Sequence, residues 1–248
     1  MTTLRHRMYK QYKQPFLFAT VMFMKVSSLC YVSSVRSLSS VSSVSSVSSV
    51  SGVSGVSGGL AFNSIIKKTI LHDTKMPSIY LENSFLCDNN DTRFKNKFFS
   101  AEHIFPQCQL NNKHKNDMHN IIKTTNTLNV NRSNYMFVDD NDINPKDKNW
   151  VALDFGNYVN HKYKVFSPND YSRGFISRAI LYMCWEYDYN HRKVIDTDLL
   201  IKWYFQYPPL KEERYHNEII HRIQRKHNIF ITNYFKRSNV ILKFIKKL

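Results

Sequence analysis

The chain has 248 residues, of which 35 are Lys or Arg and 19 are Asp or Glu, so its formal net charge is +16 at pH 7. This length suits one compact domain with a tail and excludes two large domains. The positive charge excludes an acidic scaffold and makes a polyanion the first partner to consider. Because 42% of the residues are hydrophobic, a packed core is available and a wholly disordered chain is excluded.

Residues 1–32 have the composition of a targeting leader. No Asp or Glu precedes Asp73, and an apolar run of ten residues at 15–24 (PFLFATVMFM) follows a basic start. Such a run is too short to span a bilayer, which needs about 20 residues, but it matches the apolar core of a secretory signal peptide. A Ser-rich, acid-free start is also typical of an organelle transit sequence. We therefore expect no membrane span and favour secretion, with an organelle or intracellular location as alternatives.

Residues 33–70 are predicted to be a low-complexity linker. Valine recurs at every third position from 41 to 56, separated by Ser and Gly. A period of three matches neither a helix nor a strand, and one valine in three residues buries too little surface to offset the ordering entropy. The predicted organisation is a leader (1–32), a linker (33–70), a folded domain (71–235) and a basic tail (236–248). The tail would be either a phosphate-contacting arm or a solubilising end.

The domain is predicted to be α+β, with strands first and helices after them. Aromatic residues, turn-forming residues and apolar residues at helical spacing indicate these elements. They are an edge strand over 93–99, a loop over 139–147 and three helices. The first helix covers 172–187, the second runs from Asp196 or Thr197 to about Tyr207, and the third ends at about Lys226. We expect the helix over 172–187 to bury one face in the core. His216, His221 and His227 are expected to be solvated helix residues.

Polar residues with catalytic potential gather between positions 102 and 134. Glu102 and His103 are adjacent, Asn120 follows in DMHNI (117–121), and Asn129 opens NVNRSN (129–134). A histidine can accept a proton near neutral pH, and carboxylate and amide oxygens suit a hard cation such as Mg²⁺. Asn120 is placed to fix the tautomer of the imidazole. Together these residues predict a hydrolytic site.

The motifs EHIFP (102–106), DMHNI and NVNRSN closely resemble those of the endonuclease I family, which belongs to the His-Me finger (ββα-metal) nucleases. The similarity continues at RGFISR (173–178) and covers about residues 76–235. It also includes Trp203, Pro208, Pro209, Glu213, Arg214, Asn217, Gln224 and Asn228. The resemblance implies an α+β fold with a ββα-metal core and additional C-terminal helices.

The resemblance also implies a function, namely a largely sequence-nonspecific endonuclease that binds DNA, and often RNA, through phosphates and leaves 5′-phosphorylated ends. By position in the motif, His103 resembles the general base, and Asn120 would orient it. Glu102 and Asn129 resemble the protein ligands of one divalent ion, Mg²⁺ or another such as Mn²⁺ or Ca²⁺. The oligomeric state stays open.

The sequence departs from the family between His103 and the DMHNI motif. Several members place there an arginine that contacts the scissile phosphate, whereas this chain has Lys113 and Lys115 but no arginine. Either a lysine substitutes as a point charge or an arginine arrives from elsewhere, with Arg132 and Arg178 as candidates. Of Arg173 and Arg178 on the predicted helix, we expect one to contact the nucleic-acid backbone and the other to pair with an internal carboxylate. The alternative function is a catalytically weak nucleic-acid-binding protein that retains the nuclease fold.

Overall fold

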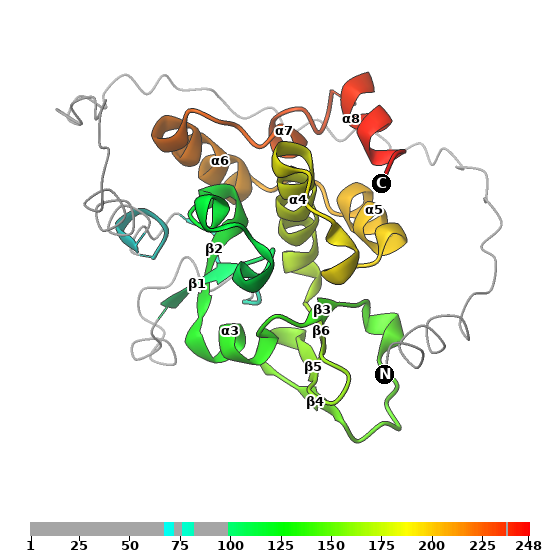
Figure 1. Ribbon diagram of the computed structural model, residues 1–248. Coiled ribbons are helices and arrows are strands. Elements are labelled where there is room, and N and C mark those ends of the chain that lie inside the picture. The colour runs from blue at the N-terminus through cyan, green and yellow to red at the C-terminus, as the bar shows by residue number, and fades with distance from the viewer. Residues whose placement is uncertain (1–66, 72–75, 82–98, 237) are drawn as a thin grey trace, which may run out of the picture. The chain divides into compact units, whose positions relative to one another are not determined.

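The structure is a computed structural model that describes residues 67–71, 76–81, 99–236 and 238–248 (Figure 1). All of them belong to one compact unit, residues 51–248. The expected leader and the Val-repeat part of the expected linker lie outside the described residues. So does the expected edge strand over 93–99, except for Phe99.

Two antiparallel strands and a helix form the first part of the described fold. Strand β1 (Phe99–His103) pairs with β2 (Ile121–Thr125), and helix α3 (Asn126–Arg132) follows β2 without a gap. The Thr125 side chain caps α3 by accepting a hydrogen bond from Leu128 N. Helix α3 packs against β1. Asn129 and Arg132 therefore lie on a helix that packs against the strand ending at His103.

The connection between β1 and β2 contains three short 3₁₀ turns. They span Gln107–Gln109, Asn112–His114 and Met118–Asn120. Asn111 and Asp117 cap the second and third turns by accepting backbone hydrogen bonds. The connection is therefore ordered by its own side chains as well as by its neighbours.

A second sheet has four strands, β3 (Met136–Phe137), β4 (Trp150–Ala152), β5 (Tyr158–Asn160) and β6 (Val165–Ser167), in the order β3-β6-β5-β4. The β3–β6 pair is parallel and the other pairs are antiparallel. Further 3₁₀ turns lie at Asp140–Asp142, Asp154–Gly156 and His191–Lys193. The predicted loop over 139–147 is confirmed, because its one regular element is the first of these turns.

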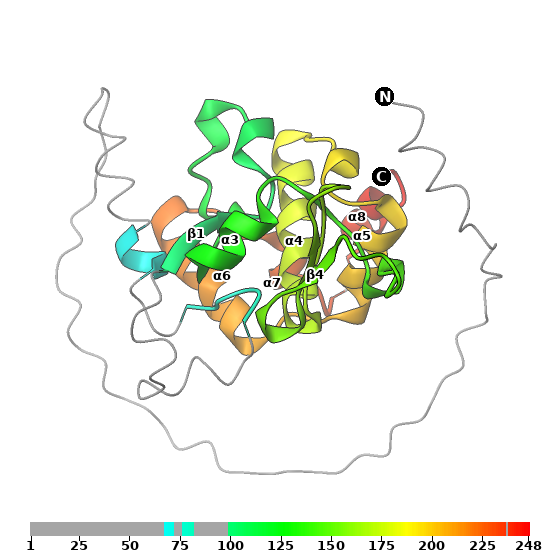
Figure 2. The same cartoon turned by 90° about the horizontal axis from the view of Figure 1, so that it is seen from below.

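Helix α4 (Asp170–Tyr187) is the centre of the helical part, which also contains α5 (Thr197–Gln206), α6 (Lys211–Gln224), α7 (Ile229–Thr232) and α8 (Asn239–Ile245). Both views show α4 surrounded by other elements (Figure 2). The predicted core face of α4 is buried, and so is every other residue from Ser172 to Cys184, so the helix is enclosed on more sides than the sequence pattern indicates. Helices α5 and α7 and the turn before β2 all pack against it. The α+β class itself is confirmed.

Both ends of the described fold pack more closely than the sequence suggested. A short π-helix, Lys67–Leu71, brings Ile70 into a cluster with Met118, Ile121 and Ile220, inside the range expected to be linker. Ile241 and Ile245 of α8 are buried in the main core. The expected tail is therefore a packed helix, because its apolar residues recur four apart. Among the described helices, none has both the length and the apolar character needed to cross a membrane.

Candidate active site

Glu102 lies on β1 as a buried carboxylate, with 1% of its surface exposed. Its Oε1 accepts a hydrogen bond from the Tyr80 hydroxyl at 2.9 Å and lies 3.3 Å from Arg132 Nε. Burial raises the pKa of Glu102 to about 7, and the nearby Arg132 charge and the Tyr80 hydrogen bond oppose this rise. A further positive charge at this carboxylate would therefore favour its ionised form.

Arg132, at the end of α3, supports the backbone that carries the candidate site. Its guanidinium donates to the carbonyl oxygens of Ile104 at 2.5 Å, Ser133 at 2.8 Å and His103 at 3.3 Å. Only 1% of its surface is exposed. The expectation that Arg132 contacts nucleic acid is therefore corrected: its two terminal nitrogens donate inside the protein, where they hold the end of β1.

His103 contacts the turn segment before β2. Its Nε2 lies 2.9 Å from the Lys115 carbonyl oxygen. Because a carbonyl can only accept, this contact favours the tautomer with the proton on Nε2, in which Nδ1 is an acceptor. The side-chain amide nitrogen of Gln107 lies 2.9 Å from Nδ1 and 3.1 Å from Nε2. Burial lowers the pKa of His103, so the ring is neutral near pH 7.

Asn129 projects from α3 toward β1. Its Nδ2 donates to Ser100 Oγ at 2.7 Å and to the Ala101 carbonyl at 3.3 Å. Side chains alternate along a strand, so Ser100 and Glu102 share one face of β1. Asn129 is thus anchored on the same face as Glu102. Because both contacts use Nδ2, its Oδ1 is the atom that could coordinate a cation.

The donor set fits a hard divalent cation. Glu102 Oε2 and Asn129 Oδ1 are oxygen donors, the type that Mg²⁺, Mn²⁺ and Ca²⁺ prefer. In the described part of the chain, no group of three His, Cys, Asp or Glu side chains could hold a metal ion. One carboxylate and one amide oxygen would leave most positions to water and substrate, which suits Mg²⁺.

Asn120 contacts the backbone that follows His103 rather than the imidazole. Its Oδ1 accepts from Phe105 N at 2.7 Å, and its Nδ2 donates to Phe105 O at 3.0 Å. Its backbone oxygen accepts from Ile104 N at 3.1 Å. These contacts differ from the expected direct contact with His103. The carboxamide has a donor nitrogen and an acceptor oxygen side by side, so it pairs with the Phe105 backbone as a neighbouring strand would, and it fixes the chain that leaves β1.

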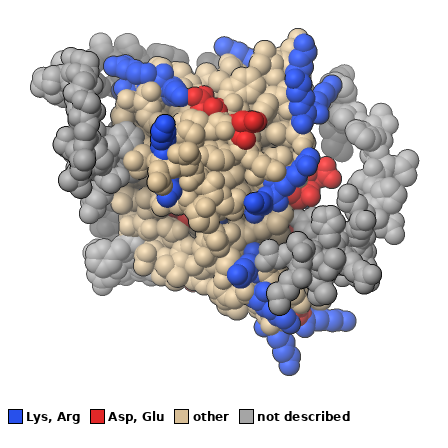
Figure 3. Space-filling view, viewed as in Figure 1, with Lys and Arg blue, Asp and Glu red and all other residues tan. Residues whose placement is uncertain are grey.

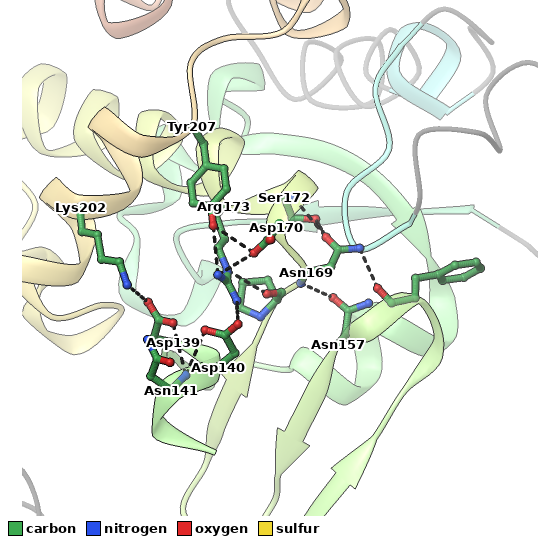
Figure 4. A network of polar contacts seen from close by, with 12 residues as sticks. Asp139, Asp140, Asn141, Asn157, Asn169, Asp170, Ser172, Arg173, Lys202 and Tyr207 are labelled. Carbon is green, nitrogen blue, oxygen red and sulfur yellow. Dashed lines mark hydrogen bonds and ion pairs between the residues drawn. The ribbon is translucent and has the colours of Figure 1, made fainter. Parts of the chain in front are cut away.

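Arg173 and Arg178 are both buried and paired with carboxylates, which are exposed for Arg173 and buried for Arg178. Arg178, 1% exposed, binds Glu213 through two hydrogen bonds of 2.7 and 2.6 Å. Arg173 lies 2.7 Å from Asp170, 3.4 Å from Asp140 and 3.1 Å from the Tyr207 hydroxyl (Figure 4). Arg178 thus pairs internally, as expected for one of the two. The expectation that the other contacts the nucleic-acid backbone is corrected, because Arg173 is also buried and paired.

The lysines of the β1–β2 connection are the sequence-predicted cations that still reach solvent. Lys113 is exposed and Lys115 is half-buried. On the face seen in Figure 3, Lys and Arg side chains are spread over several places and do not gather in one patch. The two lysines lie in the same turn segment whose carbonyl holds His103. They remain the candidates for contact with phosphate.

Sequence reasoning missed Tyr80 and Gln107, which contact Glu102 and His103. Tyr80 is 22 residues from Glu102 in the chain, and no periodicity or motif links the two. Gln107 could have been found from its position four residues after His103, within reach of the same turn. The contact between His103 and the Lys115 carbonyl could not be predicted from residue types, because every residue has a backbone carbonyl.

Comparison with known proteins agrees with the motif order. A sequence model of the family described as Endonuclease I matches residues 60–234. The protein Endonuclease-1 of Buchnera aphidicola subsp. Baizongia pistaciae (strain Bp) is 27% identical over 132 residues. That alignment covers 51% of this chain and 50% of the relative, so the chain spans about half the length of the curated relative that it matches. The family match contains β1, β2, α3 and every candidate site residue discussed above.

Proposed function

Because this chain belongs to the endonuclease I family, we propose that it is an endonuclease that hydrolyses phosphodiester bonds of DNA with the help of one divalent ion such as Mg²⁺. The observation that carries the proposal is the contact of His103 Nε2 with the Lys115 carbonyl, which leaves Nδ1 as an acceptor, at the residue that follows the buried carboxylate of Glu102 in β1. A general base must be unprotonated at the working pH, and burial favours this form by lowering the pKa of His103.

In the proposed reaction, His103 Nδ1 accepts the proton of the attacking water. The imidazolium that forms keeps its Nε2–H bonded to the Lys115 carbonyl, which stabilises the positive ring. The Gln107 side chain is exposed, so water can replace it at Nδ1. Arg132 and Asn120 hold the backbone on either side of His103 and so fix the position of the ring.

Glu102 and Asn129 would hold the divalent ion through Oε2 and Oδ1. When bound, such an ion would supply charge stabilisation for the scissile phosphate and the departing 3′ oxygen. Loss of the 3′ oxygen leaves the phosphate on the other fragment, so the expected products carry 5′-phosphates. Binding would be largely sequence-nonspecific, because Lys113 and Lys115 are point charges suited to phosphates rather than to base edges.

Cleavage of a supercoiled plasmid tests the proposal. We expect nicked and linear products with Mg²⁺ or Mn²⁺, none with EDTA, and little with a Glu102→Gln variant. Fresh 5′ ends should accept label from a polynucleotide kinase only after phosphatase treatment. Retention of the plasmid in a gel-shift assay with no cleavage in any divalent ion would favour the alternative, a binding protein that retains the fold.

A further inference from the structure

Tyr80 belongs to the short segment 76–81, whose residues are all buried. Its hydroxyl donates to Glu102 Oε1 at 2.9 Å. Arg132 Nε approaches the same oxygen at 3.3 Å, but that nitrogen has no hydrogen bond of good geometry in the described part of the chain. The bond from Tyr80 is therefore the better-aligned restraint on the Glu102 carboxylate.

The backbone of Tyr80 is fixed from two directions. Its N–H donates to Ser172 Oγ at 2.7 Å in the first turn of α4, and its carbonyl accepts from Asn157 Nδ2 at 2.8 Å. The preceding residue donates its N–H to the Lys123 carbonyl on β2 at 2.9 Å. Contacts with α4, with Asn157 and with β2 thus fix the position of the Tyr80 backbone, and so the position of its hydroxyl relative to Glu102.

Tyr80 also has an unusual backbone conformation. Its φ is +65°, in the left-handed region that is costly for a bulky residue. Such strain persists only where surrounding contacts enforce it, and it is concentrated at functional sites. The ring lies 4.9 Å from that of Phe166, so removing the hydroxyl alone would leave the packing in place. The left-handed backbone of Tyr80 places its hydroxyl within hydrogen-bond distance of Glu102 Oε1.

We propose that Tyr80 is a positioning residue for Glu102: its hydroxyl occupies Oε1, holds the carboxylate in one orientation and leaves Oε2 for the divalent ion. The inference rests on the proposed role of Glu102 as a metal ligand. A neutral donor suits this task, because it orients the carboxylate without adding a positive charge that would repel the ion. Outer contacts of this kind typically contribute a factor of about 10 to 100 in metal affinity.

Binding of Mn²⁺ alone to the full chain, followed by electron paramagnetic resonance, tests the inference without turnover. Tyr80→Phe should weaken Mn²⁺ binding about tenfold. Its far-ultraviolet circular dichroism spectrum should be unchanged, which shows that the variant is folded. The matched control is Tyr171→Phe, because the Tyr171 hydroxyl is buried without a hydrogen-bond partner in the described structure. That variant should bind Mn²⁺ as the wild type does. In cleavage assays, Tyr80→Phe should need more Mg²⁺ for half-maximal rate but approach the wild-type rate at saturation.

The outcomes separate this inference from the proposed function. If Glu102→Gln binds Mn²⁺ normally, Glu102 is not the ligand and both fail. If Glu102→Gln loses Mn²⁺ binding while Tyr80→Phe matches Tyr171→Phe, the positioning role alone is overturned. Should Tyr80→Phe not fold, Ser172→Ala removes the hydroxyl that anchors the Tyr80 backbone. We then expect weaker Mn²⁺ binding by this variant, and unchanged affinity would overturn the role.

Discussion

The carbonyl oxygen of Lys115 lies 2.9 Å from Nε2 of His103, a residue 12 positions earlier in the chain. This contact favours the tautomer in which Nδ1 is the acceptor nitrogen, so the turn segment before β2 influences the protonation of the ring. The segment is itself held by tyrosines near the end of α4. His114 stacks on Tyr187 with ring centroids 3.9 Å apart, and Asp117 Oδ2 accepts from Tyr182 and Tyr187 at 3.0 and 2.6 Å.

Replacing Asp117 with Ala should loosen this segment and slow cleavage. The carboxylate accepts two tyrosine hydroxyls and also caps the third 3₁₀ turn through His119 N. Hydrogen bonds to a charged group are worth about 1.5–3 kcal/mol each, so the free energy of unfolding should fall by at least about 2 kcal/mol. Urea denaturation measures the loss. Tyr187→Phe removes one of the bonds and should cost less, and an Asp117→Ala protein as stable as the wild type would contradict this role.

The buried pair of Arg178 and Glu213 should contribute to stability rather than to nucleic-acid binding. Leaving one buried charge without its partner costs about 3–5 kcal/mol, so Arg178→Met should be strongly destabilised in urea. A double variant, Arg178→Met with Glu213→Leu, should be more stable than Arg178→Met alone. If Arg178→Met stays folded but loses affinity for DNA, the arginine contacts phosphate after all.

The partners of these buried arginines could not be predicted from the sequence. Arg178 binds Glu213, which lies 35 residues later in the chain, and no local sequence pattern predicts that pairing. An arginine on a predicted helix of a basic protein therefore suggested a phosphate contact, whereas its partner directs it into the core. The strand–strand–helix order and the position of Asn129 on α3 were predictable, because the motifs keep their order along the chain.

The four-stranded sheet was not predictable for a different reason. Its strands have two or three residues each, too few to show an alternating pattern. They are held by pairing with one another, with β6 between β3 and β5. His216 is a comparable case: the expected solvated histidine is buried on the inner face of α6, because its neighbours on the helix turn that face toward the second core cluster.

His216 should make the protein sensitive to acid. Burial lowers its pKa to about 3, whereas a histidine of the unfolded chain titrates near 6.5. Below about pH 6.5 the unfolded state takes up a proton that the folded state does not, so stability falls as the pH falls. The raised pKa of Glu102 increases stability as the pH falls from 7 to 4.5 and so opposes the effect of His216. The effect of His216 is therefore measured as the difference between the wild type and a His216 variant.

The variant is His216→Gln, followed by urea unfolding at pH 7 and pH 5. Between these values the wild type should lose about 2 kcal/mol more than the variant, at about 1.4 kcal/mol per pH unit below 6.5. Glu102 contributes equally to both proteins and cancels from the difference. Equal losses in the two proteins would mean that His216 takes up its proton in the folded state as well.

Lys113 and Lys115 should contribute to nucleic-acid affinity through charge alone. Replacing either with Ala should weaken all duplex sequences about equally and reduce the slope of log affinity against log salt by about one. The Lys115→Ala variant keeps the backbone carbonyl that holds His103. Lys243→Ala is the matched control, because Lys243 is exposed on α8, across α4 from β1 in both views.

Binding is measured with Ca²⁺ and a His103→Ala background so that the probe survives. A loss that depends on the sequence of the probe would indicate base readout instead of phosphate contact. An equal change of slope in the Lys243→Ala control would show that charge anywhere on the protein suffices, and the turn segment would then have no special part in binding.

The central claim is that His103 accepts the proton of the attacking water, and single-turnover cleavage at saturating Mg²⁺ tests it most directly. His103→Ala should cleave about 10²- to 10⁴-fold more slowly than the wild type, with its fold and its Mn²⁺ affinity retained. The control is His161→Ala, which removes an exposed histidine and should cleave at the wild-type rate. A His103→Ala rate within tenfold of the wild-type rate at neutral pH would contradict the account, because another group would then activate the water.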